Sequence, residues 1–555
     1  MQTLVQFGAG NIGRGFIAPT FTAAGWAVVF VDIDRARIAA LNQRQAYLVR
    51  EVAAREVRVA PVSGIVGDDL DAVAGALARC DLAATAVGLG ALRHLGRPLA
   101  EGLRRRDRPL DVLVCENGAT ASEQLRAAVL AHAGADERAR LDAALGCVRT
   151  SIGRMIPPTA PGGDLLDIDV EPYAHLPVER AAFRGPVPDV PHLDARADFD
   201  LVLRQKLYLH NLTHACLAYA GQPRGYVTIP DCMADAALVD GARAAGAEAV
   251  EALARAHGRD DRARAAIRAE CFALLDDLIA RYRNRALGDP VARVARDPLR
   301  KLAGDDRLVG AARLCLAQRV APNAIARHIV LATRYRAAAD EPDAARWNDL
   351  RRAGPIDVLR AAANLTDTEP LMKTIATANH RLAAAQAMQR AGIILRQDEI
   401  DALEIADFGL GRFPEFGLAI HVYVNTDRCC AKELVMTPGQ ICPEHRHPPI
   451  DGDPGKEETF RVRQGEVRLY LPGHKKDSGE REAALKFVPA DKQGTVTMFR
   501  CVHLKPGDQY TLKPNTPHWF VAGADGAVVS EFSTKSRDEA DVFTDPAIKR
   551  LPDAA

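Results

Sequence analysis

The chain has 555 residues, of which 48% are hydrophobic and 26% are charged, close to the averages of globular proteins. At ~150 residues per domain this length predicts three or four domains, and the composition excludes a largely disordered or collagen-like chain. The 72 basic and 72 acidic residues balance, so the net charge gives no reason to expect a nucleic acid or an anionic membrane as partner.

No apolar stretch is long enough to predict a membrane span, and the N-terminus lacks the basic segment of a signal peptide. The eleven cysteines are scattered, odd in number and without a CxxC pair. We interpret them as reduced thiols and expect a cytoplasmic protein. The sequence does not decide the oligomeric state, so a homo-oligomer stays open.

Residues 1–195 alternate short apolar runs with helical patterns. The strands predicted there are Thr3–Phe7, Ala27–Val31, Leu82–Val87 and Val112–Cys115. Strands that alternate with helices predict an α/β domain with a mainly parallel, doubly wound sheet of Rossmann type. The eight prolines between Pro157 and Pro191 predict an irregular crossover or extra strands after that sheet.

Two further regions differ from the first in composition and in the spacing of their apolar residues. Residues 196–390 carry long helical patterns, such as Arg262–Tyr282 and Leu371–Arg390, and predict an all-α domain. Residues 391–555 carry alternating apolar residues with frequent glycine and proline, and predict an antiparallel all-β domain. Within it, the pattern from Phe460 to Leu471 predicts a β-hairpin that turns at Gln464-Gly465.

The first predicted strand runs into a glycine-rich turn that opens a predicted helix. The turn contains Gly8, Gly10, Asn11, Ile12 and Gly13. Glycines in this position permit a tight turn and a close approach of a pyrophosphate to the helix N-terminus. Asp32, at the end of the second predicted strand, is placed to bind ribose hydroxyls and, with Asp34 nearby, to repel a 2′-phosphate. We therefore predict that NAD, rather than NADP, is the cofactor.

Three segments resemble a known family. They are FGAGNIGRGF (residues 7–16), Cys115-Glu116-Asn117 and Arg154-Met155-Ile156-Pro157-Pro158. Together they resemble the long-chain mannitol dehydrogenases over residues 1–385, and most closely the mannitol-1-phosphate 5-dehydrogenases. The resemblance implies an NAD-dependent oxidation of a polyol to a ketose.

The helical domain contains Lys206, Asn211 and His214 in the spacing Lys-x4-Asn-x2-His. On an idealised α-helix this spacing does not keep all three on one stripe, so a buried Asn–His pair is an equal alternative on pattern alone. The family resemblance implies that Lys206 is a general base that works without metal, and that Asn211 and His214 orient the substrate oxygen. It also implies that Asn117 is a substrate-binding residue.

A second family segment contains Arg300 and Arg307, which are candidates for binding a substrate phosphate or hydroxyls; a solvated basic helix end is the alternative. Two residues depart from the family pattern. Gly153 stands where members usually have Asp, and Arg204 stands near the lysine where many have Glu. Both departures change the charge around the proposed base.

The β-domain contains a cluster typical of a metal site. His445 and His447 are two residues apart, so on a strand they face the same way. With Glu458 and His518 they form three imidazoles and one carboxylate, a ligand set for Mn, Fe, Co, Ni or Zn. We take manganese as the first candidate. The spacing resembles the two cupin motifs with an inserted loop, Pro448–Gly455, and implies a cupin barrel.

The surrounding sequence is more specific. The segments Tyr423–Arg428, Lys432–Leu434, Cys442–Pro449, Glu458–Phe460, His518–Phe520 and Phe543–Pro546 resemble the cupin D-lyxose isomerases from about residue 391 to the C-terminus. Aldose–ketose isomerisation needs a metal to polarise two sugar oxygens and a base to move a proton between their carbons. Lys456 is a candidate to stabilise the oxyanion and Glu531 a candidate base; a salt-bridged surface Lys and a solvated Glu are the alternatives.

The sequence thus predicts a bifunctional enzyme of sugar and polyol metabolism with small-molecule polyol, ketose and aldose substrates. A shared ketose makes the fusion chemically sensible: D-xylulose links arabinitol to lyxose, and D-fructose links mannitol to mannose. One alternative is a sugar-phosphate dehydrogenase with an independent isomerase. Another is a non-catalytic sugar-binding β-domain. A cupin dioxygenase is disfavoured because nothing specifies an aromatic or thiol substrate.

Overall fold

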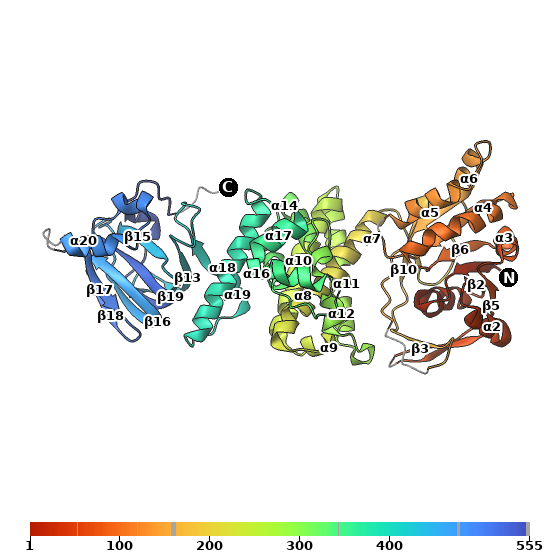
Figure 1. Cartoon of the computed structure of the whole chain (residues 1–555), viewed down its shortest axis with the longest axis horizontal. Coiled ribbons are helices and arrows are strands. Elements are labelled where there is room, and N and C mark those ends of the chain that lie inside the picture. Colours follow the sequence, from red (N-terminus) through yellow and green to blue (C-terminus); the bar gives the residue numbers. More distant parts are fainter. Residues whose placement is uncertain (53, 119, 157–162, 342, 474–477, 551–555) are drawn as a thin grey trace. The chain divides into compact units, whose positions relative to one another are not determined.

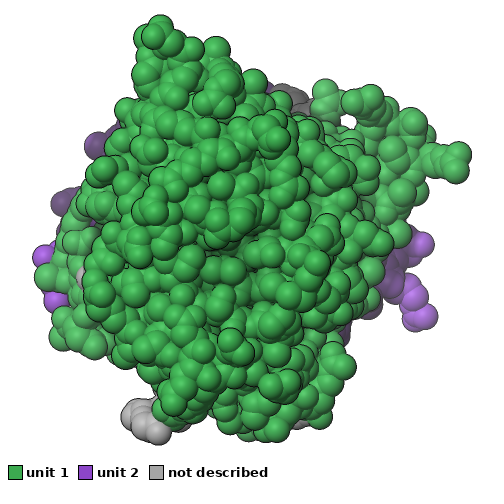
Figure 2. All heavy atoms as spheres, turned by 90° about the vertical axis from the view of Figure 1, so that its right-hand side faces the viewer, with its two compact units in different colours: residues 1–320, 335–347 green, residues 321–334, 348–555 purple. Residues whose placement is uncertain are grey.

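The computed structural model describes the chain except for residues 53, 119, 157–162, 342, 474–477 and 551–555. Its contacts divide the chain into two compact units, which Figure 2 shows in different colours. The first unit consists of Met1–Val320 and Tyr335–Trp347, and the second consists of Ala321–Arg334 and Asn348–Ala555. In the described part of the chain, no helix has both the length and the apolar character needed to cross a membrane.

The first unit begins with a six-stranded parallel sheet in the order β5-β2-β1-β6-β7-β8. Its strands are β1 (Thr3–Phe7), β2 (Ala27–Asp32), β5 (Val62–Val66), β6 (Leu82–Thr85), β7 (Leu110–Val114) and β8 (Leu145–Arg149). The central strands β1, β6 and β7 are buried on both faces, as parallel strands between helical layers are. The four predicted strands are confirmed, and β5 and β8 are additional.

Separate apolar cores lie on the two faces of this sheet. Leu4 of β1 faces a core that contains Phe16 and Leu41, whereas Val5 of β1 faces a core that contains Leu99. The helices that supply these cores are η1 (Gly13–Ile17), α1 (Ala18–Thr22), α2 (Arg35–Arg44), α3 (Leu70–Arg79), α4 (Gly96–Arg104), α5 (Ala121–Leu130) and α6 (Arg138–Ala144). Figure 1 shows α4 and α5 over one side of the sheet and α2 beside β5.

The proline-rich segment forms short extra strands, as predicted. They are β9 (Ile168–Val170), β10 (Leu176–Glu179) and β11 (Leu193–Arg196). β10 pairs with β11, and β9 pairs with β3 (Tyr47–Glu51), which also pairs with β4 (Glu56–Val59). Pro157 and Pro158 of the family segment lie outside the described residues.

A helical region completes the first unit and supplies one wall of its site. It contains α7 (Phe199–Gln205), η4 (Lys206–Asn211), α8 (Leu212–Gly221), α9 (Ile229–Cys232), α10 (Ala236–His257), α11 (Asp261–Arg281), α12 (Val291–Ala295), α13 (Pro298–Lys301) and α14 (Val309–Ala317). The predicted helix Arg262–Tyr282 is α11. η4 is a π-helical turn inserted between α7 and α8, so the helix that carries Lys206 is not uniformly α-helical.

The second unit contains helices as well as the β-domain. They are α15 (Asn323–Thr333), α17 (Pro355–Ala363), α18 (Pro370–Arg390), α19 (Gln397–Ala402) and α20 (Ser478–Leu485); α16 (Ala344–Ala353) spans the division between the units. The predicted helix Leu371–Arg390 is α18. Its residues Ala384 and Met388 share an apolar core with Phe413, Ala419 and Val435 of the β-domain. α18 is therefore built into the second unit.

The β-domain is a nine-stranded, antiparallel sheet system. Its strands are β12 (Glu404–Ala406), β13 (Leu418–Asn425), β14 (Cys430–Met436), β15 (Ile441–Arg446), β16 (Glu458–Leu471), β17 (Arg500–Leu504), β18 (Gln509–Leu512), β19 (His518–Ser533) and β20 (Val542–Phe543). β14 and β15 both pair with β19, and β16 pairs with β17, β18 and β19. The long strands β16 and β19 carry most of the inward-facing residues of the core.

The predicted hairpin at Gln464-Gly465 is wrong. β16 continues through these residues and pairs with β19 from Glu458 to Tyr470. The register shifts twice around Gly465, whose φ is +72°, so this glycine forms a β-bulge rather than a turn. A bulge and a tight turn both favour glycine with positive φ, and local sequence does not separate them.

Candidate functional site

The glycine-rich turn connects β1 to η1. Gly8 has a φ of +90°, and a Cβ on Gly8 or Gly13 would clash with the carbonyl oxygens of Ala86 and Gly8, respectively. A Cβ on Gly10 would meet nothing, so the turn is open to solvent at that position. Asn11 and Ile12, which follow, line the large cleft described below. The predicted dinucleotide turn is thus held in shape by glycines and leads directly into a cavity.

Asp32 lies at the end of β2, next to the same turn. Its carboxylate accepts hydrogen bonds from the backbone N–H of Ala9 at 2.6 Å and of Asp34 at 2.9 Å. Asp34 itself caps α2 by accepting from the N–H of Arg37. The carboxylate of Asp32 is therefore fixed beside the turn, where a ribose would meet it.

A cleft of 870 Å³ brings together residues from the sheet and from the helical region. Its walls include Asn11, Ile12, Gly88, Glu116, Asn117, Gly153, Arg154, Lys206, His210, Asn211, His214, Asp289 and Arg293. All four of the predicted polyol-site residues, Asn117, Lys206, Asn211 and His214, are among them.

The π-helical turn explains how Lys206 and Asn211 reach one cleft. On an ideal α-helix a five-residue separation turns the two side chains away from each other. A π-helix closes its hydrogen bonds from residue i to i+5, so the fifth residue returns close to the first. The predicted mismatch of the spacing assumed a regular α-helix, and η4 removes it.

Lys206 has the surroundings that a general base needs. Its Nζ donates to Oδ1 of Asn117 at 3.3 Å. Burial in the cleft and the positive charge of Arg307 lower the pKa of Lys206 to about 8. A lysine with this pKa is partly neutral near physiological pH and can accept a proton.

His214 is oriented by two neighbours. Its Nε2 lies 2.7 Å from Oδ2 of Asp289, and its ring stacks on Tyr282 at a centroid distance of 4.9 Å. Asp289 also accepts from Nε of Arg293 at 2.9 Å. Sequence analysis missed Asp289, because it lies 75 residues beyond its partner and no local spacing marks it.

Arg300 and Arg307 are not among the described residues that line the cleft. Arg300 pairs with Asp297 at 2.5 Å, and Arg307 pairs with Asp306 at 2.7 Å. Arg307 is still close enough to influence the pKa of Lys206. Of the two departures from the family pattern, Gly153 lines the cleft, whereas Arg204 is exposed at the end of α7.

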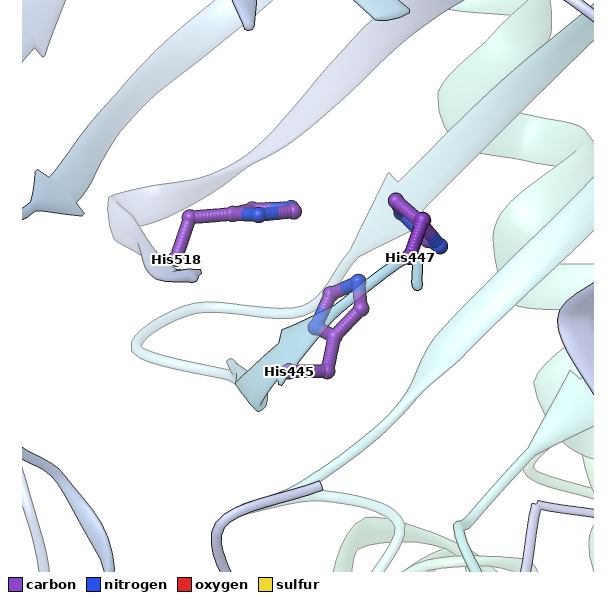
Figure 3. A group of neighbouring side chains, drawn as sticks. All are labelled: His445, His447 and His518. Atoms are coloured by element: carbon purple, nitrogen blue, oxygen red, sulfur yellow. The ribbon is translucent and has the colours of Figure 1, made fainter. Parts of the chain in front are cut away.

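The second unit contains a cluster of three buried histidines. His445 and His447 come from the end of β15, and His518 begins β19. One potential ligand atom from each ring lies within 4.8 Å of the others, and Figure 3 shows the rings facing a common space. Oε1 of Glu458 lies 3.1 Å from Nε2 of His447 and 3.2 Å from Nε2 of His518. All four predicted metal ligands therefore converge.

Each histidine has its Nδ1 engaged by an oxygen. Nδ1 of His445 lies 2.8 Å from the carbonyl of Pro443, that of His518 lies 2.9 Å from the carbonyl of Thr516, and that of His447 lies 2.5 Å from Asp541. These contacts put the proton on Nδ1 and leave Nε2 as the lone-pair donor. Nε2 of His518 is buried and makes no hydrogen bond, although Glu458 lies 3.2 Å away, as expected of an atom that binds a metal.

The electrostatics of the cluster agree with this arrangement. Burial and the neighbouring histidines lower the pKa of His445 to about 3. Burial also lowers the pKa of His518 to about 4. For His447 burial acts in the same direction, but the carboxylates of Glu458 and Asp541 outweigh it and raise its pKa to about 9. A divalent cation at Nε2 would take the place of that proton.

Lys456 bridges two buried carboxylates next to the histidines. Its Nζ lies 2.7 Å from Glu458 and 2.5 Å from Oε1 of Glu531. These two charges outweigh the effect of burial and keep the pKa of Lys456 well above its usual value. The alternatives of a surface lysine and a solvated glutamate are therefore wrong: both side chains are buried in the cavity beside the histidines.

The same cavity contains four charged residues to which sequence analysis gave no role: Lys432, Asp538, Asp541 and Arg550. Lys432 pairs with Asp538 at 2.7 Å. Asp538 and Asp541 precede the short C-terminal strand β20, and Phe543 of that strand stacks on His445. No metal-ligand spacing links Asp538 or Asp541 to the histidines, so only the fold brings these two carboxylates to them.

Comparison with known proteins gives matches to both halves. Three family models match: the mannitol dehydrogenase Rossmann domain over residues 2–192, the mannitol dehydrogenase C-terminal domain over 200–392, and D-lyxose isomerase over 385–555. A mannitol-1-phosphate 5-dehydrogenase of Bacillus licheniformis is 34% identical over 67% of this chain and 98% of its own length. A D-lyxose/D-mannose isomerase of Thermosediminibacter oceani is 52% identical over 30% of this chain and 90% of its own length.

Among solved structures, a substrate-free D-sorbitol dehydrogenase has a TM-score of 0.56 at 17% identity. It covers 72% of this chain and 94% of its own, and supports the fold alone. Together the matches make the chain an oxidoreductase fused to an isomerase. It belongs to the mannitol dehydrogenase family over residues 2–392 and to the D-lyxose isomerase family over residues 385–555. These families imply NAD for the first part and a divalent metal for the second.

Proposed function

We propose that the dehydrogenase part interconverts a polyol and a ketose with NAD, and that the isomerase part interconverts the same ketose with its aldose. The polyol, ketose and aldose are arabinitol, D-xylulose and D-lyxose in one version, or mannitol, D-fructose and D-mannose in the other. The observation that carries the proposal is the presence in one chain of two complete candidate sites, one around Lys206 and one around the three histidines. The names of the dehydrogenase relatives favour a second candidate, a phosphorylated polyol as substrate.

In the dehydrogenase site, the glycine turn would hold NAD and Asp32 would bind its ribose hydroxyls, and NAD would supply the hydride acceptor. Lys206 takes the proton from the hydroxyl that is being oxidised. The contact of its Nζ with Asn117 positions it, and the amide of Asn211 stabilises the oxygen as its charge grows. His214, fixed by Asp289 and Tyr282, orients the same oxygen.

In the isomerase site, His445, His447, His518 and Glu458 would hold a divalent metal, which would supply Lewis-acid chemistry. We propose manganese as the first candidate for this metal. We also propose that the antiparallel strands of the β-domain close into a cupin barrel. Glu531 takes a proton from the carbon beside the carbonyl and returns it to the neighbouring carbon. The ammonium of Lys456, 2.5 Å from Glu531, stabilises the negative charge that develops on the sugar oxygens.

The test is a coupled assay on the whole chain. With D-arabinitol or D-mannitol and NAD, the absorbance of NADH should rise and the matching aldose should appear by chromatography. EDTA should stop aldose formation and leave NADH formation intact, because the proposed base of the dehydrogenase is a lysine. Equal loss of both reactions on chelation would show that the division into two sites is wrong.

Replacing Asp32 should change the coenzyme preference. The wild-type protein should use NAD much better than NADP, because a fixed carboxylate repels a 2′-phosphate. Asp32→Ser removes this charge, so the ratio of kcat/KM for NAD to that for NADP should fall by about tenfold or more. A wild-type protein that already uses both coenzymes equally would contradict the role of Asp32.

The pH dependence of the dehydrogenase reaction should follow the pKa of Lys206. Below about pH 8 Lys206 holds its proton and cannot accept another, so polyol oxidation should rise with pH and level off above the pKa of about 8. Ketose reduction needs the ammonium form and should fall over the same range. Arg307→Gln removes a positive charge that lowers this pKa and should shift both profiles to higher pH. Arg296→Gln, at an exposed arginine, serves as the control, and an unshifted Arg307→Gln profile would contradict the assignment.

A further inference from the structure

A second cavity of 200 Å³ opens beside Lys206 in the same unit. It shares Gly153, Lys206 and His210 with the large cleft, and none of the nucleotide-turn residues lines it. The second cavity therefore adjoins Lys206 and lacks the residues of the nucleotide turn, so it is free to take the part of the substrate that does not face the cofactor.

Its walls carry groups that bind hydroxyls. Oη of Tyr173 lies 3.4 Å from Nδ1 of His175, whose Nε2 lies 3.1 Å from Asp194. Glu270 accepts from Arg196 at 2.7 Å and from Nε2 of Gln205 at 3.0 Å. Neutral donors and acceptors alternate with paired charges, a lining that suits a polyhydroxylated chain rather than an apolar one.

The arginines that line the two cavities are already paired with carboxylates. In the second cavity Arg196 pairs with Glu270, and Arg281 pairs with Glu171 at 2.5 Å. In the large cleft Arg154 pairs with Glu51 at 3.0 Å, and Arg293 pairs with Asp289 at 2.5 Å. A phosphate dianion needs cations to offset its desolvation, and these guanidinium groups are each neutralised by a carboxylate of the protein.

Gly153 lies where the two cavities meet. The residue has no side chain to occupy the junction, and a Cβ there would come within 3.1 Å of the Tyr173 ring. Its carbonyl accepts from Arg281 at 2.6 Å, which fixes the backbone at this point. The departure from the family pattern at residue 153 thus leaves a passage from Lys206 into the second cavity.

We propose that the second cavity binds the distal hydroxyls of the polyol or ketose whose reacting carbon lies at Lys206, and that its lining selects the free substrate over its phosphate. This inference rests on the proposed dehydrogenase function and adds to it the subsite for the rest of the substrate chain. It also matches the isomerase part, whose relatives are named for free sugars.

The first experiment compares free and phosphorylated substrates on the whole chain. NADH oxidation is measured with D-fructose, D-xylulose and D-fructose 6-phosphate under the same conditions. A higher kcat/KM for a free ketose than for the phosphate supports the proposal. A higher value for D-fructose 6-phosphate overturns it and leaves the dehydrogenase function standing. No oxidation with any ketose would instead overturn the proposed function itself.

The second experiment fills the cavity. Leu274 of α11 lines it, whereas Ala273 on the same helix is exposed outside it. Leu274→Trp should lower kcat/KM for the six-carbon D-fructose by about tenfold or more relative to the four-carbon D-erythrulose. Ala273→Trp should leave both unchanged, and NADH affinity measured by fluorescence should not move in either variant.

An equal loss for both chain lengths in Leu274→Trp, or no loss at all, would overturn the assignment of the cavity to the distal hydroxyls. Circular dichroism checks that each variant is folded. If Leu274→Trp does not fold, Leu274→Phe fills part of the same space and is judged by the same comparison of chain lengths.

Discussion

His447→Ala is expected to abolish isomerisation and to leave ketose reduction at the wild-type rate, while Lys206→Ala does the reverse. Removing one of four ligands costs most of the affinity for a metal or leaves a misshapen site. Loss of a positioned base costs roughly 10²–10⁴-fold in rate. The two residues lie in different compact units with separate cores, so their effects should be independent.

The rates of isomerisation and of ketose reduction are measured for both variants, together with the metal content of each purified protein. His503→Ala is the matched control, because His503 of β17 pairs with Glu466 of β16 at an exposed position and is not among the residues that line the cavity of the cluster. Lys206→Ala should keep its metal and His447→Ala should lose it. A folded His447→Ala protein that also loses ketose reduction would mean that the two activities are coupled.

A fragment of residues 391–555 is expected to be much less stable than one of residues 321–555. Only the longer fragment contains α15 and α18. α18 covers Phe413, Ala419 and Val435 with Met388, which is fully buried. Loss of a buried methionine side chain alone costs about 2–5 kcal/mol, a large share of the ~5–15 kcal/mol that stabilises a typical domain. Arg327 of α15 also pairs with Asp401 at 2.5 Å.

Thermal unfolding of both fragments, followed by circular dichroism, checks this. The longer fragment should show one cooperative transition and isomerase activity, and the shorter one a lower midpoint or aggregation. Met388→Ala in the longer fragment should lower the midpoint without removing the helix. Equal midpoints for the two fragments would mean that residues 391–555 form a self-sufficient domain, as the change of sequence texture near residue 391 predicts.

The parts of the fold that could be predicted from sequence are the strands and helices that have a clear local pattern of apolar residues. The apolar runs Thr3–Phe7 and Ala27–Val31 became β1, which is almost wholly buried, and β2, in which buried and half-buried residues alternate over most of its length. β5 and β8 escaped notice because a glycine interrupts the apolar run of each. The long strand β16 was predicted as a hairpin because Gly465, which lies in a β-bulge, was interpreted as a turn residue.

The residues of the two candidate sites also divide into those that local sequence predicts and those that it does not. The glycine turn, the pair His445 and His447, and Glu458 are recognisable because their spacing reflects local geometry. Asp289 and Asp541 orient His214 and His447 from distant segments, and only tertiary folding makes them neighbours. The relation of Lys206 to Asn211 depends on a departure from regular helical hydrogen bonding, for which the local residues carry no evident signal.

The π-helical turn Lys206–Asn211 also restricts how the chain can change in length. Such a turn contains one more residue per hydrogen-bonded loop than an α-helical turn, and everything after it is rotated accordingly. Deleting a single residue from this turn would restore a regular helix and rotate Asn211 and His214 by about 100° relative to Lys206. A substitution along this helix keeps the spacing of Lys206, Asn211 and His214, but a change of even one residue in its length would separate the base from the groups that orient its substrate.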